Sequence, residues 1–439
     1  MQVLFILQNG ALHMSEEKKI KVLVLGDHPM APSGVGGQLK YICETLLNTG
    51  RYSIVCLGGA VKHENYDPQT IPGDGWKDED WVVHPIDGYG NAEMIRSIVW
   101  TEKPDTLLFM TDPRFYPWLW QIENEIRPLM PMVYYHVWDN YPYPKYNKVW
   151  YESTDVIASI SKVTHDIVNN VTPAVENHYL PHAVSRKFGI KTDEYISEFR
   201  KEHFNLSEEN KDKVIFFWNN RNARRKMSGS ILIWFGEFAE EVGAENTCLV
   251  MHTDPKDMNG QDLEAIILDH RLDDGRINLS TQKVTPGVLS DLYSAADCTI
   301  NISDAEGFGL ATLESLSCGT PIIVNMTGGL QEQVTDGEEW FGIGIEPASK
   351  AIIGSQDVPY IYEDRVSKED FKAALHKMYN MPKEEREELG RKGAEHVRKN
   401  YNFEDFQNKW IELMDSVHER YGSWDTRKGY KLWEMKEIA

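Results

Sequence analysis

The sequence is poor in cysteine, in basic residues and in long apolar runs. Its 439 residues include five scattered cysteines and no CxxC pair. That pattern excludes a disulfide framework and a cysteine-ligated zinc site, and it indicates reduced core thiols in a cytoplasmic protein. No apolar run approaches the roughly 20 residues of a membrane-spanning helix.

Positive charge is scarce, because 46 Lys and Arg stand against 68 Asp and Glu, for a formal net charge of −22. Such a field repels nucleic acid and anionic lipid headgroups unless a local basic patch overrides it. With 41% hydrophobic and 26% charged residues the composition is that of a globular protein. A chain of 439 residues exceeds one ordinary core and predicts two or three domains.

The first residues do not resemble the start of the fold. MQVLFILQNGALHM has a short apolar run with no basic residue before it, which is not a signal-peptide core. Met14, followed by SEEKKIKVLVLGD, resembles a natural start. We therefore expect residues 1–13 to be an added leader outside the fold.

Apolar runs alternate with helical patterns along most of the chain. KVLVLG (21–26) is typical of a strand buried on both faces of a parallel sheet. A glycine-containing loop follows, and QLKYICETLLNTG (38–50) then has helical spacing. A second series of the same kind begins at KVIFFWNN (213–220). The pattern predicts an α/β protein with two doubly wound domains and a ligand cleft between the carboxyl ends of their strands.

A highly charged segment separates the two series, between about residues 186 and 212. We place the domain boundary there, which gives units of 14–190 and 191–402. The remaining residues, 403–439, begin with an apolar stripe at helical spacing, and we expect this amphipathic helix to pack on another surface.

The stretch DAEGFGLATLESLSCGTPIIVN (304–325) carries two carboxylates in an apolar setting. The predicted strand before it ends at residue 303, so Glu306 lies in the loop at a strand's carboxyl end, where ligands bind in such sheets. Glu314 lies inside the following helix. Backbone N–H groups at Gly307 and Gly309 and the helix N-terminus favour an anion. Carboxylates beside free amides suit a polyol attached to a phosphate, whereas the alternative is that Glu306 caps the helix and Glu314 satisfies a neighbouring backbone group or a lysine.

The longer stretch LYSAADCTINISDAEGFGLATLESLSCGTPIIVNMTGG (292–329) closely resembles the signature of the retaining GT-B glycosyltransferases of family GT4. That signature is a Tyr…Ala-Asp helix, a strand, Glu-x7-Glu and Gly-x-Pro before a strand, and Glu306 and Glu314 match its spacing. The resemblance implies a GT-B fold, with two Rossmann-like domains facing a cleft and the C-terminal helix crossing back to the N-domain. Residues 14–190 would be the acceptor domain and 191–402 the nucleotide-sugar domain.

The resemblance also implies the reaction and its residues. A sugar would move from a UDP-, GDP- or ADP-sugar to an acceptor hydroxyl with retention of anomeric configuration, with no metal and no cofactor required. Glu306 would hold the donor-sugar hydroxyls and Glu314 the ribose of the nucleotide. The backbone that would line the sugar site is that of Gly307, Phe308, Gly309 and Leu310.

A basic segment, WNNRNARRKMSG (218–229), follows a predicted strand. A departing nucleoside diphosphate needs fixed cations or a metal, and arginine forks suit phosphate oxygens. The segment contains four cations, Arg221, Arg224, Arg225 and Lys226. It resembles the family's Gly-Arg…Lys-Gly element at Arg221 and Lys226, although neither glycine is present. Which arginine pairs with Lys226 stays open, and a solvated loop is the alternative.

Further candidates lie in the N-terminal half. Gly36 and Gly37 would let the backbone approach the phosphates, as the family's glycine pair does, or they only make a turn. His136 resembles a family histidine that contacts the donor sugar, although a lone His is usually a satisfied core residue. Trp138, Asp139 and Tyr141 form an acceptor platform in one interpretation and part of the core in the other.

Rival interpretations concern both the metal and the activity. The DED segment at residues 78–80 has the spacing of a metal-dependent transferase motif, but we interpret it as a solvated loop. A nucleotide-sugar epimerase and a non-catalytic sugar-nucleotide-binding protein are the alternative functions. An NAD-dependent dehydrogenase is disfavoured, because the glycines come too far after the strand. The donor base and sugar, the acceptor and the oligomeric state stay open.

Overall fold

The computed structural model describes residues 18–204, 210 and 212–430, and the predicted leader at 1–13 lies outside these residues. The first domain contains an eight-stranded sheet with the order β3-β4-β2-β1-β5-β6-β7-β8. All neighbours in it are parallel except the pair β3 and β4. The strands are β1 (Ile20–Asp27), β2 (Tyr52–Gly59), β3 (Gln69–Thr70), β4 (Trp81–Pro85), β5 (Thr106–Thr111), β6 (Met132–His136), β7 (Val156–Ser159) and β8 (Glu176–Tyr179).

Helices connect these strands in the alternation that the sequence predicts. They are α1 (Gly34–Leu47), α2 (Ala92–Glu102), α3 (Pro117–Gln121), α4 (Glu123–Ile126), α5 (Lys148–Glu152) and α6 (Lys162–Val171). The prediction of a loop at Gly36 and Gly37 is wrong, because both belong to α1. Ser33 caps this helix by accepting a hydrogen bond from the Gly36 N–H, which moves the helix start ahead of the apolar periodicity.

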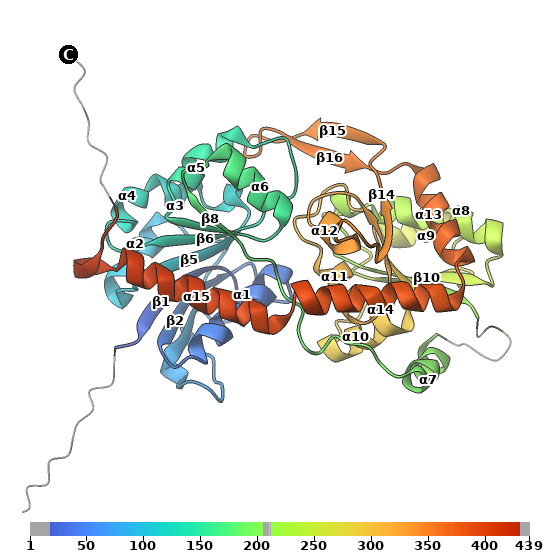
Figure 1. Ribbon diagram of the computed structural model, residues 1–439, viewed down its shortest axis with the longest axis horizontal. Coiled ribbons are helices and arrows are strands. Elements are labelled where there is room, and N and C mark those ends of the chain that lie inside the picture. Colours follow the sequence, from blue (N-terminus) through green and yellow to red (C-terminus); the bar gives the residue numbers. More distant parts are fainter. Residues whose placement is uncertain (1–17, 205–209, 211, 431–439) are drawn as a thin grey trace, which may run out of the picture.

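The second domain contains a six-stranded parallel sheet with the order β11-β10-β9-β12-β13-β14. Its strands are β9 (Val214–Asn219), β10 (Thr247–His252), β11 (Ile277–Ser280), β12 (Cys298–Asn301), β13 (Ile322–Asn325) and β14 (Gly342–Ile345). Its helices are α7 (Asp193–His203), α8 (Ser228–Val242), α9 (Leu263–Asp269), α10 (Pro286–Ala295), α11 (Leu310–Ser317), α12 (Leu330–Val334), α13 (Lys368–Asn380) and α14 (Lys383–Asn400). Two doubly wound domains therefore lie side by side, as the sequence predicts (Figure 1).

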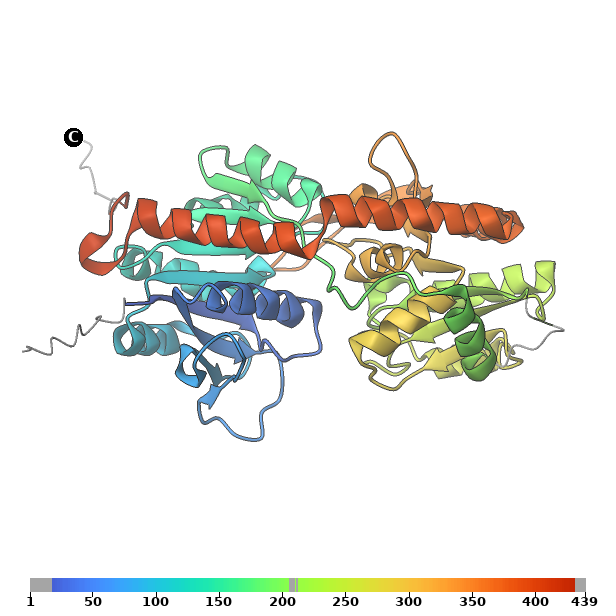
Figure 2. The same cartoon turned by 60° about the horizontal axis from the view of Figure 1, so that its bottom comes forward.

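Two further elements join the domains. The last helix, α15 (Phe403–Tyr421), leaves the second domain and packs beside α1 of the first (Figures 1 and 2). Its Trp410 is fully buried, with its ring centroid 4.8 Å from that of Tyr135 on β6. An antiparallel hairpin of β15 (Ser349–Ile353) and β16 (Ile361–Arg365), which we did not predict, reaches the first domain, where the Tyr362 N–H donates to the Tyr141 carbonyl at 2.7 Å.

Two expectations concern disulfide bonds and membrane-spanning helices in the described part of the chain. The five cysteines are buried and form no disulfide, as predicted for core thiols. Among the described residues, no helix is both long and apolar enough to cross a membrane.

Candidate active site

The carboxyl ends of strands from both sheets meet at the interface between the domains. A Cβ added to Gly307, in the loop after β12, would lie 2.9 Å from Oδ1 of Asp139, in the loop after β6. A Cβ on Gly328, in the loop after β13, would lie 2.7 Å from the Asp139 carbonyl oxygen. Ligand sites of open α/β sheets lie at this edge.

Glu306 forms an ion cluster with two cations from the basic segment, the buried Lys226 and the half-buried Arg225. Lys226 and Glu306 are 7% and 8% exposed, and Lys226 Nζ donates to the Glu306 carboxylate. Arg225 Nη1 lies 3.6 Å from the same carboxylate and donates to the Ala305 carbonyl at 2.6 Å. Burial alone would raise the pKa of Glu306, but the charges of Lys226 and Arg225 outweigh it and lower the pKa to about 2. The cluster is therefore an ionised carboxylate held between two cations.

The other two arginines of the segment point to different partners. Arg221 Nε donates to Asp257 in the loop after β10 at 2.6 Å, and its side chain is mostly exposed. Arg224 donates to Glu363 on β16. Because residues 224–226 form a single 3-10 turn, Arg225 and Lys226 both reach Glu306. The structure thus pairs Lys226 with Arg225 and not with Arg221, the residue that the family element indicates.

Glu314 lies on α11 and is half-buried. Tyr293 on α10 donates a hydrogen bond from its hydroxyl to Glu314 Oε2 at 3.0 Å. Burial raises the pKa of Glu314 to about 7, and the hydrogen bond from Tyr293 opposes that shift. This half-buried carboxylate has acceptor capacity left for a ligand.

The two glycines of α1 have different surroundings, because Gly36 is closely packed and Gly37 faces open space. A Cβ on Gly36 would lie 2.7 Å from the His28 carbonyl oxygen, so the close approach of the preceding loop requires glycine there. A Cβ on Gly37 would meet no atom within 4 Å. Gly37 therefore presents bare backbone to open space in the first turn of α1.

The aromatic segment after β6 is mainly core. His136 is fully buried, with Nε2 2.7 Å from the Tyr151 hydroxyl, and burial lowers its pKa to about 3, so the imidazole is neutral. Trp138 is 3% exposed and donates from its indole to the Asn140 carbonyl, as in the core interpretation. Tyr141 donates to Asp166 at 2.8 Å. Asp139 lies against the loop that carries Glu306, and a Cβ on Gly307 in that loop would also lie 3.7 Å from the Trp138 carbonyl oxygen.

Sequence reasoning missed two acidic residues at the same sheet edge. Asp112 follows β5, and its carboxylate interacts electrostatically with Asp139 and Arg225. Asp27 ends β1 and accepts hydrogen bonds from Ser33 Oγ at 2.5 Å and from the Tyr89 hydroxyl at 2.9 Å. The signal was present, because the adjacent strands β1, β5 and β6 are each followed or closed by aspartate in LGD, MTD and VWD.

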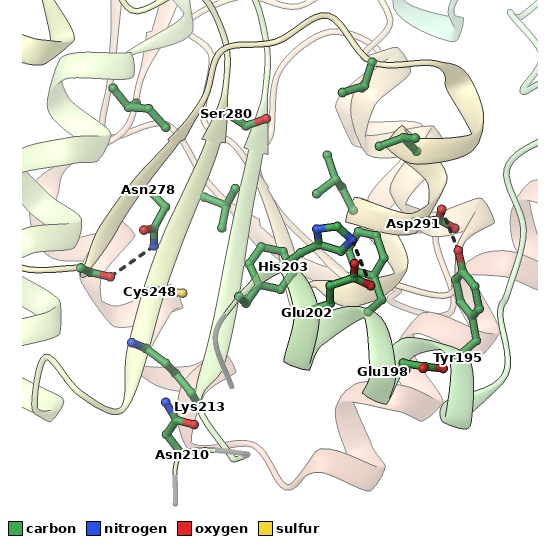
Figure 3. Close-up of a pocket in the computed structure, with 18 residues that line it drawn as sticks. Tyr195, Glu198, Glu202, His203, Asn210, Lys213, Cys248, Asn278, Ser280 and Asp291 are labelled. Carbon is green, nitrogen blue, oxygen red and sulfur yellow. Dashed lines mark hydrogen bonds and ion pairs between the residues drawn. The ribbon is translucent and has the colours of Figure 1, made fainter. Parts of the chain in front are cut away.

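Two other features lie away from this cluster. The interpretation of residues 78–80 as a solvated loop is wrong for Asp80, which is buried in a 3-10 turn and accepts a hydrogen bond from Lys19 Nζ at 2.5 Å. A cavity of about 920 Å³ lies between α7, α10 and the strands β10 and β11, with Tyr195, His203, Cys248 and Asp291 in its lining (Figure 3). None of the predicted site residues lines that cavity.

Known proteins resemble the chain in two ways. Residues 279–396 match the family described as glycosyl transferases group 1. D-inositol 3-phosphate glycosyltransferases from Thermomonospora curvata and Acidothermus cellulolyticus are 43% and 45% identical over 67 residues, which is 15% of this chain and 16% and 15% of those proteins. The chain thus matches about a sixth of the length of these curated relatives.

Solved structures match nearly the whole chain. Sucrose-phosphate synthase from Thermosynechococcus elongatus has a TM-score of 0.71 at 17% identity and covers 92% of this chain and 100% of its own. Anabaena Alr3699/HepE in complex with UDP and glucose has a TM-score of 0.60 at 12% identity, with 90% and 100% covered. The fold is therefore GT-B, and the resemblance to GT4-type glycosyltransferases is confirmed.

Proposed function

We propose that the protein transfers a sugar from a nucleotide-diphosphate sugar to an acceptor hydroxyl with retention of anomeric configuration. The observation that carries this proposal is the ion cluster of the half-buried Arg225 with the buried Lys226 and Glu306 at the interface of two doubly wound domains. The match of residues 279–396 to group 1 glycosyltransferases supports it, as does the fold shared with a structure that holds UDP and glucose.

In the proposed reaction the donor's diphosphate lies against Arg225 and Lys226. As the bond between the anomeric carbon and the phosphate oxygen breaks, its electron pair passes to the diphosphate, and the two fixed cations stabilise the growing charge. The acceptor oxygen forms the new bond from the same face, and its proton passes to a phosphate oxygen. No metal ion and no cofactor are required in this scheme.

Glu306 orients the sugar in this proposal and does not attack it. Its pKa of about 2 and its contacts with Lys226 and Arg225 make the carboxylate a weak nucleophile, because both cations hold its negative charge. The same carboxylate can still accept hydrogen bonds from sugar hydroxyls. Asp139, with Asp112 beside it, lies on the first-domain side and would accept hydrogen bonds from the acceptor.

The test is a thermal-shift panel of UDP, GDP, ADP and CMP with their common sugar conjugates, on wild type and Glu314→Ala. A nucleotide at 100 times its Kd should stabilise the fold by about 2.7 kcal/mol. We expect one nucleotide family to raise the melting temperature of wild type, and we expect the shift to disappear in Glu314→Ala. No shift with any nucleotide would contradict the transferase and favour another function.

Gly37→Ala tests the backbone approach to the phosphates. Because a Cβ at this position meets nothing within 4 Å, the substitution should leave the fold intact and stabilise α1 by up to about 1 kcal/mol. If phosphates lie against this turn, the added methyl should weaken nucleotide binding about tenfold. Calorimetric titration and urea unfolding measure the two effects, and an unchanged Kd would place the phosphates elsewhere.

A further inference from the structure

Three polar side chains of the second domain are linked by hydrogen bonds that end at Glu314. Asn219, at the end of β9, donates from Nδ2 to the Tyr293 hydroxyl at 2.8 Å. That hydroxyl donates in turn to Glu314 Oε2 at 3.0 Å. The chain thus runs from the strand that precedes the basic segment, through α10, to the carboxylate on α11.

The direction of this chain is fixed. An amide Nδ2 can only donate, so the Tyr293 oxygen accepts from Asn219 and its single proton is left for Glu314. Glu314 must therefore accept the hydrogen bond from this hydroxyl, and an ionised carboxylate can do so with either oxygen. Among the described residues, Glu314 forms no ion pair. Its carboxylate accepts a hydrogen bond from the Tyr293 hydroxyl.

The Tyr293 ring is held independently of its hydroxyl. The side chain is fully buried, with its ring centroid 5.1 Å from that of Phe217 and 6.1 Å from that of Phe188. Thr320 Oγ1 also donates to the Tyr293 carbonyl at 2.7 Å. The ring position therefore does not depend on the contact with Glu314, and the hydroxyl can be removed while the packing is kept.

We propose that Tyr293 is a positioning residue that, with Asn219, holds the Glu314 carboxylate in one rotamer with its second oxygen turned to the ribose diol of a bound nucleotide. This inference rests on the proposed function. A carboxylate has about four lone-pair sites, and Tyr293 uses one of them, so two ribose hydroxyls can be accepted at the others. The arrangement favours a ribonucleotide donor over one that lacks these hydroxyls.

The same contact links nucleotide binding to pH. Only the ionised carboxylate accepts every hydrogen bond of this scheme, so nucleotide affinity should be full above the pKa of Glu314, about 7, and fall as the pH drops through it. The titratable groups that interact with Glu314 are Tyr41 on α1, Tyr293 on α10 and Cys318 after α11, and all three are neutral in this range. Removing the Tyr293 hydroxyl should raise the pKa of Glu314 further and move the loss of affinity to higher pH.

The experiment compares Tyr293→Phe with a matched control, Tyr52→Phe. Tyr52 is also a buried tyrosine whose hydroxyl donates to a carboxylate, that of Asp415 at 2.5 Å, but it lies at the start of β2, away from the site. The ligands are the tightest-binding nucleoside diphosphate among UDP, GDP and ADP, and its 2′,3′-dideoxy analogue. Calorimetry gives each Kd between about pH 6 and pH 9, a range that brackets the titration of Glu314.

We expect Tyr293→Phe to bind the ribonucleotide about tenfold more weakly than wild type, and the dideoxy analogue with unchanged affinity. The pH midpoint of binding should rise, KM for the donor should rise and kcat should change little. Tyr52→Phe should lose stability without any of these changes. If Tyr293→Phe does not fold, Asn219→Ala should move the pH midpoint in the same direction.

Two results would overturn the inference, and they are distinguishable. A folded Tyr293→Phe that keeps the wild-type preference for ribose and the wild-type pH midpoint rules out the positioning role while the transferase stands. A wild type that binds none of the three nucleotides rules out the proposed function, and the role of Tyr293 with it.

Discussion

Lys226→Met is expected to lower the rate of sugar transfer about a thousandfold, because one of two fixed cations at the departing diphosphate is removed. The methionine side chain keeps most of the lysine's apolar volume, so the loss is mainly one of charge. The rate is measured as transfer or, before an acceptor is known, as release of the nucleoside diphosphate from the donor. Wild-type turnover in this variant would show that the diphosphate does not lie against Lys226.

The same substitution should also destabilise the fold, and this effect has to be separated from catalysis. Removing one partner of a buried ion pair costs roughly 3–5 kcal/mol, and Arg225 at 3.6 Å from Glu306 should offset part of it. The double variant Lys226→Met/Glu306→Gln removes the stranded charge and should recover stability without recovering turnover. Lys21→Met, which breaks a half-exposed pair with Glu102, should change neither by much.

The fold follows from the sequence where burial is continuous. The apolar runs at 21–26 and 213–220 became β1 and β9, each within one residue at either end, because strands covered on both faces are apolar throughout. The hairpin of β15 and β16 carried no such pattern. Its second strand is IYEDR, whose Glu363 and Asp364 are buried and accept hydrogen bonds from Arg224 and Asn140, which are distant in the sequence. Nothing local in the sequence shows that such partners exist.

The candidate site divides in the same way. The spacing of Glu306 and Glu314 within one strand–loop–helix unit is local, so the sequence places both residues relative to the strand end. Which arginine joins Lys226 at Glu306 is not decided locally, because distant residues bind the other two. Asp257, after β10, pairs with Arg221, and Glu363, on the hairpin, pairs with Arg224. His136 likewise has its hydrogen-bond partner, Tyr151, on the following helix α5.

Gly328→Ala is expected to lower turnover about a hundredfold, because it forces apart the loops that bring the two domains together. A Cβ at this position would lie 1.8 Å from the Glu306 carbonyl oxygen and 2.7 Å from that of Asp139. Both neighbours are backbone atoms, so the loop that carries Glu306 has to move relative to the first domain. Turnover and nucleotide Kd are measured together, and turnover should fall more, since reaction needs both domains in place.

The backbone conformation of Gly328 requires its own control. Its φ is +48°, where a side chain costs roughly 1–2 kcal/mol whatever the space around it. Gly337→Ala carries the same kind of strain at φ +99° with no atom within 4 Å of the added Cβ. Gly337→Ala should therefore lose stability and keep its turnover. Equal turnover in the two variants would mean that the contact between Gly328, Glu306 and Asp139 does not set the geometry in which the sugar reacts.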